Sequence, residues 1–136
     1  MSSSKTLTLS LVYSHGKRRV AHCLNAIGSF NESLSHLRAN KGNSFTNKMV
    51  VQLERLARGE RMSNRNFPKE GKLPNNKHFR ALKYIPLRGY CWSSDKFSDT
   101  YFVSHYIYKD FDKLAKSDTN RVCGNWQRIE VDGDDY

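Results

Sequence analysis

The sequence predicts an α+β fold: an N-terminal strand and a helical hairpin packed on an antiparallel sheet of three or four strands, with a C-terminal helix. Two segments between residues 29 and 59 carry apolar side chains at helical spacing. Three segments between residues 78 and 108 are rich in β-branched and aromatic residues. The chain has 136 residues, which fits one domain with a modest core.

The N-terminal segment contains one or two candidate strands. TLTLSLVY, residues 6–13, alternates apolar and polar side chains, and HGKRR interrupts it. VAHCLNAI, residues 20–27, is a second candidate. We therefore expect at least one strand before the first helix.

Two helices follow. SFNE is typical of a capping box, with Ser29 as N-cap and Glu32 three residues later, and Gly42 is a plausible C-cap. We expect Thr46 to cap the second helix and Gly59 to end it. The apolar stripe of this second helix is formed by Met49, Val50, Leu53, Leu56 and Ala57.

The second half of the chain predicts a loop, three strands and a helix. Prolines and asparagines indicate a loop over 61–76, and strands are expected at 79–85, 87–92 and 100–108. Short connections favour an antiparallel meander. Ser117 or Asp118 is expected to cap the last helix, before an acidic tail at 131–136.

The charge distribution favours a polyanionic partner. The net charge is +10, and four of the 13 acidic residues lie in the last seven positions. Residues 1–128 therefore hold 23 basic and 9 acidic side chains. A domain this basic attracts nucleic acid through counterion release, although an acidic protein partner would also suit it.

Several function classes are disfavoured. The three cysteines are widely spaced and no pair has CxxC spacing, so neither a zinc cluster nor a disulfide framework is expected. No phosphate-binding loop, metalloprotease, esterase or EF-hand motif is present, and we expect no cofactor. Short apolar runs and a charge pattern unlike a secretory signal favour a cytoplasmic protein with no membrane partner.

Cationic side chains on the predicted sheet are the remaining candidates for chemistry. Lys83 and Arg88 lie on adjacent strands, and His105 and Lys109 share one face of the last strand by alternation. Cations so placed suit a phosphodiester, and interleaved aromatics suit unstacked RNA bases. The RNA-binding residues expected are Arg80, Lys83, Tyr90, Tyr108, Lys113, Lys116 and Arg121.

The order of these motifs resembles the RelE/ParE superfamily of bacterial toxins, the HigB-like (phage Gp49-like) branch most of all. The resemblance covers residues 30–129 and rests on LERLARGERMS, NFPKEGKLPNNKHFRALK, LRGYCW, YFVSHYIYK and KSDTNRVCGNW. It implies a RelE-like toxin domain at 29–130, preceded by an extension with the first strand or strands at 1–28.

The resemblance also implies a function. Members are toxins of type II toxin–antitoxin modules, and most of the RelE and HigB branches cut mRNA on the ribosome without a metal, using the RNA 2′-OH. Here Arg88, Lys109 and His105 would be catalytic, with Lys83 on the substrate backbone. The implied partners are the ribosome, mRNA and a cognate antitoxin of helix-turn-helix type.

The sequence departs from the pattern in two places. Asp110 stands where the second lysine of a pair is expected, and Tyr90 follows Arg88 instead of preceding it. Two other functions therefore stay open: a ParE-like inhibitor of gyrase without nuclease activity, and an RNA-binding protein that does not cleave.

Overall fold

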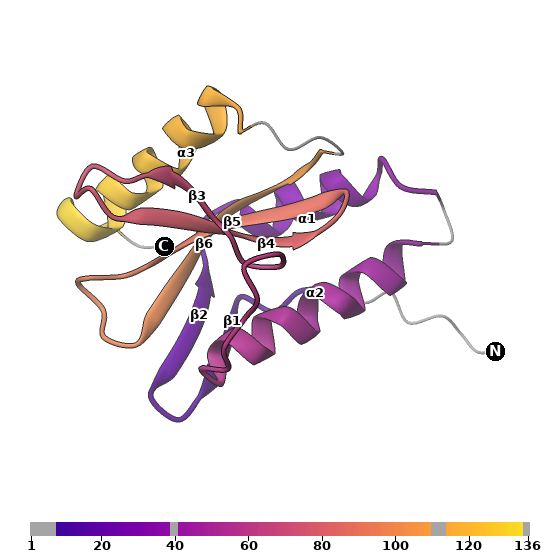
Figure 1. Cartoon of the computed structure of the whole chain (residues 1–136), viewed down its shortest axis with the longest axis horizontal. Helices are drawn as coiled ribbons and strands as arrows, with labels where there is room; N and C mark the ends of the chain where they lie inside the picture. Colours follow the sequence, from indigo (N-terminus) through magenta and orange to yellow (C-terminus); the bar gives the residue numbers. More distant parts are fainter. Residues whose placement is uncertain (1–7, 39–40, 110–113, 135–136) are drawn as a thin grey trace.

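The structure of this chain is a computed structural model that describes residues 8–38, 41–109 and 114–134. Its strands form one sheet in the order β1-β2-β6-β5-β4-β3 (Figure 1). The strands are β1 Val12–His15, β2 Arg18–His22, β3 Lys69–Lys72, β4 His78–Tyr84, β5 Leu87–Ser93 and β6 Thr100–Tyr108. Neighbours are antiparallel except β2 and β6, which are parallel. The α+β class is confirmed, but the sheet has six strands and is mixed, where three or four antiparallel strands were expected.

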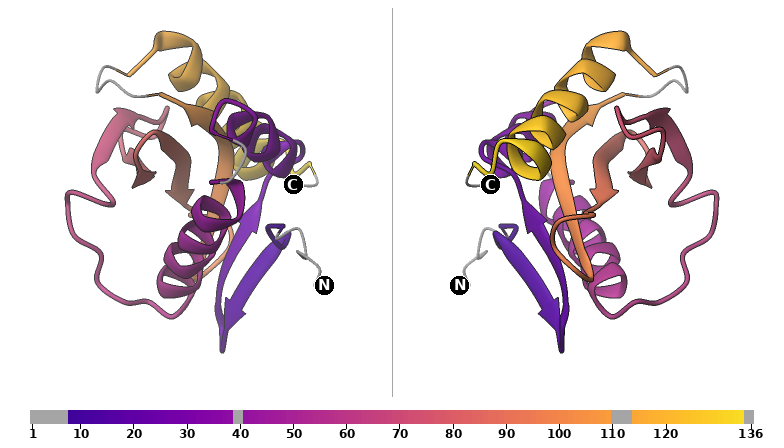
Figure 2. Two further views of the ribbon diagram at one scale, coloured as in Figure 1. Left: turned by 90° about the vertical axis from the view of Figure 1, so that its right-hand side faces the viewer. Right: turned by 90° about the vertical axis from the view of Figure 1, so that its left-hand side faces the viewer.

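Helices cover both faces of the sheet (Figure 2). Helices α1 (Ala26–Leu34) and α2 (Gly42–Ala57) pack on one face, which we call the α2 face. Helix α3 (Lys116–Trp126) packs on the other, the α3 face, and continues into one π-helical turn, η1 (Gln127–Val131). The α2-face core includes Phe30, Met49, Leu53, Leu82, Leu87 and Tyr106. The α3-face core includes Phe79, Tyr90, Trp92, Phe102, Val122 and Ile129.

The first helix begins earlier than its capping-box pattern predicts. It starts at Ala26, after Asn25 in the left-handed region at φ 68°. Ser29 is therefore inside the helix, where its hydroxyl donates to the Ala26 carbonyl at 2.6 Å and accepts the Tyr106 backbone N–H at 2.9 Å. Since β2 pairs with β6 only as far as Val103, Ser29 supplies a partner to a backbone group beyond that pairing.

The second helix also begins before its predicted cap. Gly42, expected to end the preceding helix, is the first residue of α2, and the Thr46 hydroxyl donates back to its carbonyl at 2.8 Å. A hydroxyl bonded to the residue four positions earlier belongs to a helix interior, not to an N-cap. Gly59, just after the end of α2, has a positive φ of 75°, as expected for a residue that ends a helix.

Strand positions differ most near the N-terminus. Strands β4, β5 and β6 lie within one residue of the predicted ones, whereas β1 covers 12–15 and β2 covers 18–22. Both belong to the same sheet as the later strands. Strand β3 lies in the predicted loop, because its sequence KEGK has no apolar alternation and pairs through the backbone with β4.

Glu130 is close in sequence to the acidic residues of the C-terminal tail, but its side chain belongs to the body of the fold. Its carboxylate accepts the Ser94 hydroxyl at 2.6 Å and the backbone N–H groups of Asp95 and Lys96 at 2.8 and 3.0 Å. It thereby ties η1 to the turn between β5 and β6. Residues 135–136 of the tail lie outside the described residues.

Candidate functional site

The predicted catalytic residues meet on the α3 face, where β5 and β6 run side by side. In the strand register Lys83 is opposite Arg88, and Tyr90 is opposite His105. Directly opposed side chains project from the same face of a sheet. Lys109 follows His105 at an even spacing, just after β6 ends. The fold therefore brings Arg88, His105 and Lys109 to one region, together with Lys83 and Tyr90.

Arg88 is completely buried and faces a carboxylate. Its exposed fraction is 0%, and its Nη1 lies 3.9 Å from Oε1 of Glu70 on β3. Glu70 was missed by the sequence reasoning, since it lies in the predicted loop and only the pairing of β3 with β4 brings it to this face. A buried guanidinium is costly to hold unless an opposite charge compensates it, and Glu70 supplies one.

His105 is the centre of a hydrogen-bonded chain that runs from α3 to β6. Its Nε2 lies 3.0 Å from Oδ1 of Asp118, and its Nδ1 lies 2.8 Å from the Ser104 hydroxyl. The Asn125 amide in turn donates to that hydroxyl at 2.8 Å. Because the Asp118 carboxylate accepts, the proton of a neutral His105 lies on Nε2, and Nδ1 then accepts from the Ser104 hydroxyl, which itself accepts from Asn125.

Burial is the main cause of the shifted pKa values here. It lowers the pKa of His105, while the hydrogen bond to Asp118 opposes that change. It raises the pKa of Tyr90 to about 12, assisted by the carboxylates of Asp118 and Glu70 and opposed by Arg88. The rings of Tyr90 and His105 are 5.4 Å apart. At neutral pH the site therefore contains a neutral imidazole and a protonated phenol beside cations.

Asp118 is a second residue whose role the sequence did not reveal. It was expected as a helix cap, but α3 begins after Ala115 with no side-chain cap. The Asp118 carboxylate instead turns to His105 from the first turn of the helix. No local pattern signals this contact, because Asp118 and His105 are joined only when α3 docks on the sheet.

The remaining predicted RNA-binding residues are divided between the faces. Lys116 and Arg121 are exposed on α3, and Lys83 is half-buried. Arg80 and Tyr108 project to the α2 face, where Arg80 packs over the Phe67 ring. Tyr108 stacks near His36 with ring centroids 5.1 Å apart. Lys113 and Asp110 lie outside the described residues.

The chemistry open to the α3-face group is that of charge stabilisation and proton transfer. Within residues 8–38, 41–109 and 114–134, no cluster of three or more His, Cys, Asp or Glu side chains could hold a metal ion. Buried cations stabilise a phosphate whose charge grows during a reaction. A neutral imidazole or a phenol can exchange a proton with it.

Comparisons with known proteins add no relative from which the role of this site could be transferred. No protein-family model, no curated protein and no solved structure matches the chain. In the part of the chain that the structure describes, no helix has the length and apolar character needed to cross a bilayer.

Proposed function

We propose that this protein is a growth-inhibiting toxin of the RelE/HigB type that cleaves mRNA on the ribosome. The observation that supports it is the convergence of Arg88, His105 and Lys109 from two strands onto the α3 face. The motif order of the sequence indicates the same three residues. A sequence resemblance and a spatial cluster thus indicate the same residues.

The proposed reaction uses the 2′-OH of the RNA as nucleophile. The 2′-oxygen attacks the adjacent phosphorus and passes its proton to a base while the P–O5′ bond breaks, and the leaving 5′-oxygen takes a proton from water, so that a 2′,3′-cyclic phosphate and a 5′-OH are formed. Arg88 and Lys109 stabilise the charge on the phosphate oxygens. His105 is the proposed base: once the phosphate has displaced Asp118 and the ring proton has passed to Nδ1, where the Ser104 oxygen can accept it, Nε2 takes the proton of the 2′-OH. Lys83, Lys116 and Arg121 contact the RNA backbone.

The proposal requires the α3 face to open. Arg88 and His105 have no exposed surface in the described conformation, and the carboxylates of Glu70 and Asp118 occupy positions beside them. A phosphate that binds there must replace these carboxylates. We therefore expect Glu70→Gln to bind RNA more tightly than wild type, because the buried arginine then loses its competing anion.

Controlled expression in a bacterial host tests the proposal. Growth and the 5′ ends of an abundant translated mRNA would be compared for wild type, Lys109→Gln and Arg88→Lys, with Arg65→Gln as an exposed control that changes the same charge. We expect wild type and Arg65→Gln to arrest growth and to produce new, translation-dependent cuts. Both effects should be lost in Lys109→Gln and Arg88→Lys, with circular dichroism confirming that the variants fold.

The other outcomes are equally informative. Growth arrest without cuts would contradict cleavage and favour the ParE-like alternative, in which Arg88 and Lys109 are dispensable. Neither arrest nor cuts would overturn the toxin proposal. The proposed antitoxin is tested by expressing this protein together with the product of an adjacent small reading frame. We expect that product to restore growth.

A second candidate, RNA binding without cleavage, is favoured by the burial itself. Arg88 and His105 each have 0% exposed surface. Arg88 faces Glu70 and His105 faces Asp118, as residues with a structural role in ion pairs do. This candidate predicts salt-sensitive RNA binding that is unaffected by His105→Gln, and no cut RNA at any protein concentration.

A further inference from the structure

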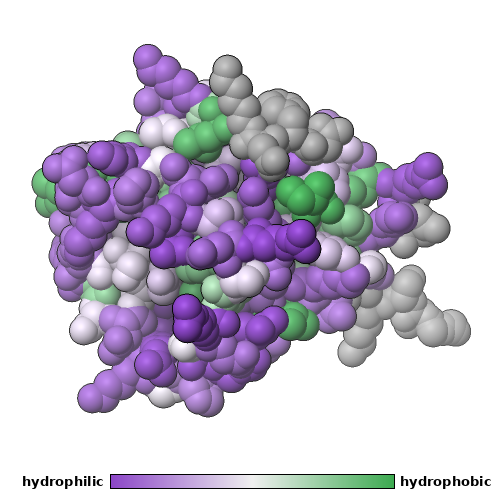
Figure 3. Space-filling view, viewed as in Figure 1, coloured by the Kyte–Doolittle hydropathy of each residue, from purple (hydrophilic) through white to green (hydrophobic). Residues whose placement is uncertain are grey.

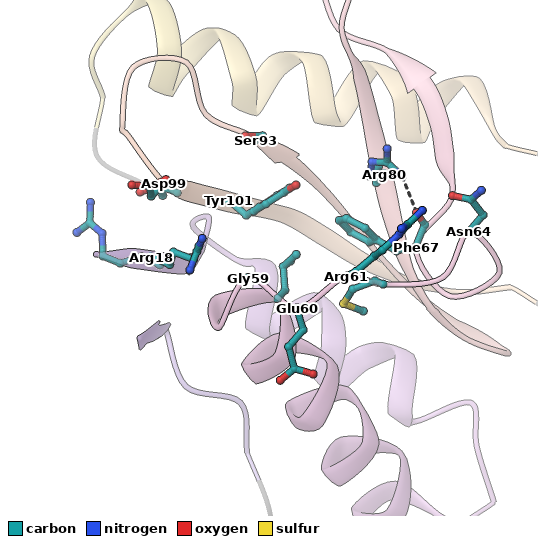
Figure 4. A pocket seen from close by; sticks show the side chains of 14 residues that line it. Arg18, Gly59, Glu60, Arg61, Asn64, Phe67, Arg80, Ser93, Asp99 and Tyr101 are labelled. Atoms are coloured by element: carbon teal, nitrogen blue, oxygen red, sulfur yellow. Dashed lines mark hydrogen bonds between the residues drawn. The ribbon is translucent and has the colours of Figure 1, made fainter. Parts of the chain in front are cut away.

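A cavity of about 500 Å³, drawn in Figure 4, lies on the α2 face, and neither Arg88 nor His105 lines it. It is bordered by the β1–β2 hairpin, the end of α2, the segment 59–67 and the sheet. Its lining includes no residue used in the proposed reaction. A ligand in this cavity would therefore not contact the residues of the proposed reaction.

The charge of the cavity favours an anion. Four arginines line it, namely Arg18, Arg19, Arg61 and Arg80. Two acidic residues also line it, Glu60 and Asp99. Glu60 is engaged by two arginines that do not line the cavity, Arg58 at 2.6 Å and Arg55 at 3.2 Å. Its charge is thus compensated from outside, which leaves the four guanidinium groups opposed mainly by Asp99.

Arg80 is held in place by its neighbours, and the exposed Arg18 lies against the chain at Gly59. Arg80 donates to the Phe67 carbonyl at 2.9 Å and lies over the Phe67 ring at 5.3 Å. The Arg18 guanidinium packs against Gly59, where a Cβ would lie 2.6 Å from its Cζ. Gly59 thus provides the space that Arg18 occupies. Guanidinium groups positioned in advance lose less entropy when they bind a phosphate.

An aromatic surface lies beside the arginines. Tyr101 projects from β6 into the cavity, and its ring meets that of Phe67 edge to face at a centroid distance of 5.8 Å (Figure 4). Burial raises the pKa of Tyr101, so its hydroxyl stays protonated. Asn64 adds an amide with donors and an acceptor. An aromatic ring, an amide and arginines together are the groups that bind a base and its phosphate.

A second cavity of about 480 Å³ continues from the first and shares Arg61 and Met62 with it. It repeats the combination of a cation and an aromatic ring, with Lys48 over the Tyr84 ring at 4.7 Å. The face of the molecule seen in Figure 3 is mostly hydrophilic, with hydrophobic residues in small separated patches. Repetition of cation and aromatic suits successive nucleotides of one strand.

We propose that the cavity on the α2 face binds a phosphorylated nucleotide unit, with Arg18 and Arg61 on the phosphate and Tyr101 against the base. The same chemistry occurs in a free mononucleotide and in single-stranded RNA. The site is independent of the proposed cleavage, because it lies on the opposite face and shares no residue with it.

Binding measurements on the full chain test the site. A fluorescein-labelled ten-nucleotide oligouridylate would be titrated by anisotropy, and AMP, GMP, CMP and UMP by calorimetry. We expect Arg61→Gln and Arg18→Gln each to weaken oligonucleotide binding roughly tenfold and to reduce the salt slope by about one. Arg65→Gln, which removes an equal charge from the same loop outside both cavities, should change binding less than about twofold.

Crosslinking separates this site from the α3 face. A 4-thiouridine oligonucleotide irradiated in the complex should attach to peptides that contain Tyr101 or Tyr84. Mononucleotide binding that depends on Arg61 assigns the site to a free nucleotide, and oligonucleotide binding alone assigns it to a strand. The proposal is overturned if neither binds, if Arg61→Gln and Arg65→Gln act equally, if crosslinks map only to Tyr90, or if polyglutamate alone binds.

Discussion

The two faces of the sheet use arginine in opposite ways. On the α3 face Arg88 is fully buried beside Glu70, among Tyr90 and the His105 network. On the α2 face Arg18 and Arg61 are exposed around an open cavity. Exposed guanidinium groups are ready for a ligand, whereas a buried one must first exchange its carboxylate. A ligand could therefore reach the α2-face arginines in the described conformation, whereas a ligand of Arg88 must first displace Glu70.

The largest expected effect separates these two kinds of arginine. Arg88→Ala should lower the free energy of unfolding by about 3–5 kcal/mol, because it empties a fully buried position and leaves the Glu70 carboxylate, whose side chain is 13% exposed, without its cation. Arg61→Gln, at an exposed position, should change it by less than about 0.5 kcal/mol. Urea denaturation measures both. A loss below about 1 kcal/mol for Arg88→Ala would show that Arg88 and Glu70 are not energetically coupled.

A pair of glycines extends the comparison to packing. At Gly89 on β5, a Cβ would lie 2.5 Å from the ring of the buried Tyr106, so Gly89→Ala should cost about 1–3 kcal/mol. At Gly124 in α3, a Cβ meets nothing within 4 Å, so Gly124→Ala should add roughly 0.5–1 kcal/mol through helix propensity. Thermal melts of the two variants should move in opposite directions. Equal shifts would contradict the packing described around Tyr106.

One buried histidine lies on each face, and both give a pH dependence of the same sign. Burial lowers the pKa of His22, which contacts the Tyr106 hydroxyl at 2.7 Å, and of His105. The unfolded chain therefore takes up protons first as the pH falls below about 6.5. The contribution of the two histidines to the free energy of unfolding should be fully present above that pH. Below it, the free energy of unfolding should decrease by at most about 1.4 kcal/mol per pH unit for each histidine.

Single substitutions distinguish the two histidines. His105→Gln and His22→Gln should each flatten the decrease in stability between pH 7 and pH 5, as followed by urea denaturation across that range. A slope that persists unchanged in the double variant would assign the pH dependence to other groups.

The smallest expected effect concerns an ion pair at the surface. Lys77 and Asp95 are more than half and about half exposed, and join the turn before β4 to the turn after β5. Lys77→Ala should reduce stability by less than about 0.5 kcal/mol, because water screens the pair. A larger loss of stability would show that this ion pair between the two turns stabilises the fold more than its exposure predicts.

Sequence patterns predicted the central strands well and the polar contacts poorly. Strands β4, β5 and β6 alternate or contain β-branched runs, so periodicity located them, with Lys83 and Arg88 on adjacent strands and His105 and Lys109 on one face. Strand β3 has no such pattern, and its pairing with β4 is what delivers Glu70. Ser29 shows the same limit, since its capping pattern was overridden by a contact 77 residues away in sequence.

The two-faced arrangement of the arginines was also beyond sequence reasoning. Arg80 was expected beside Lys83 and Arg88 on an RNA-binding surface, and alternation along β4 instead directs it to the α2 face. The cavity there combines residues from the β1–β2 hairpin, the end of α2 and the segment 59–67. Only tertiary packing brings Arg18 next to Gly59.

The most direct test of the proposed cleavage is the chemistry of the cut RNA ends. Purified wild-type protein would be added to a translating extract with a reporter mRNA, and a second reporter would carry a 2′-O-methyl group at the mapped cut site. We predict ends with a 2′,3′-cyclic phosphate and a 5′-OH, no cut at the methylated position, and no cut with Lys109→Gln. Ends with a 5′-phosphate, or cleavage at the methylated position, would contradict a reaction through the 2′-OH on the α3 face.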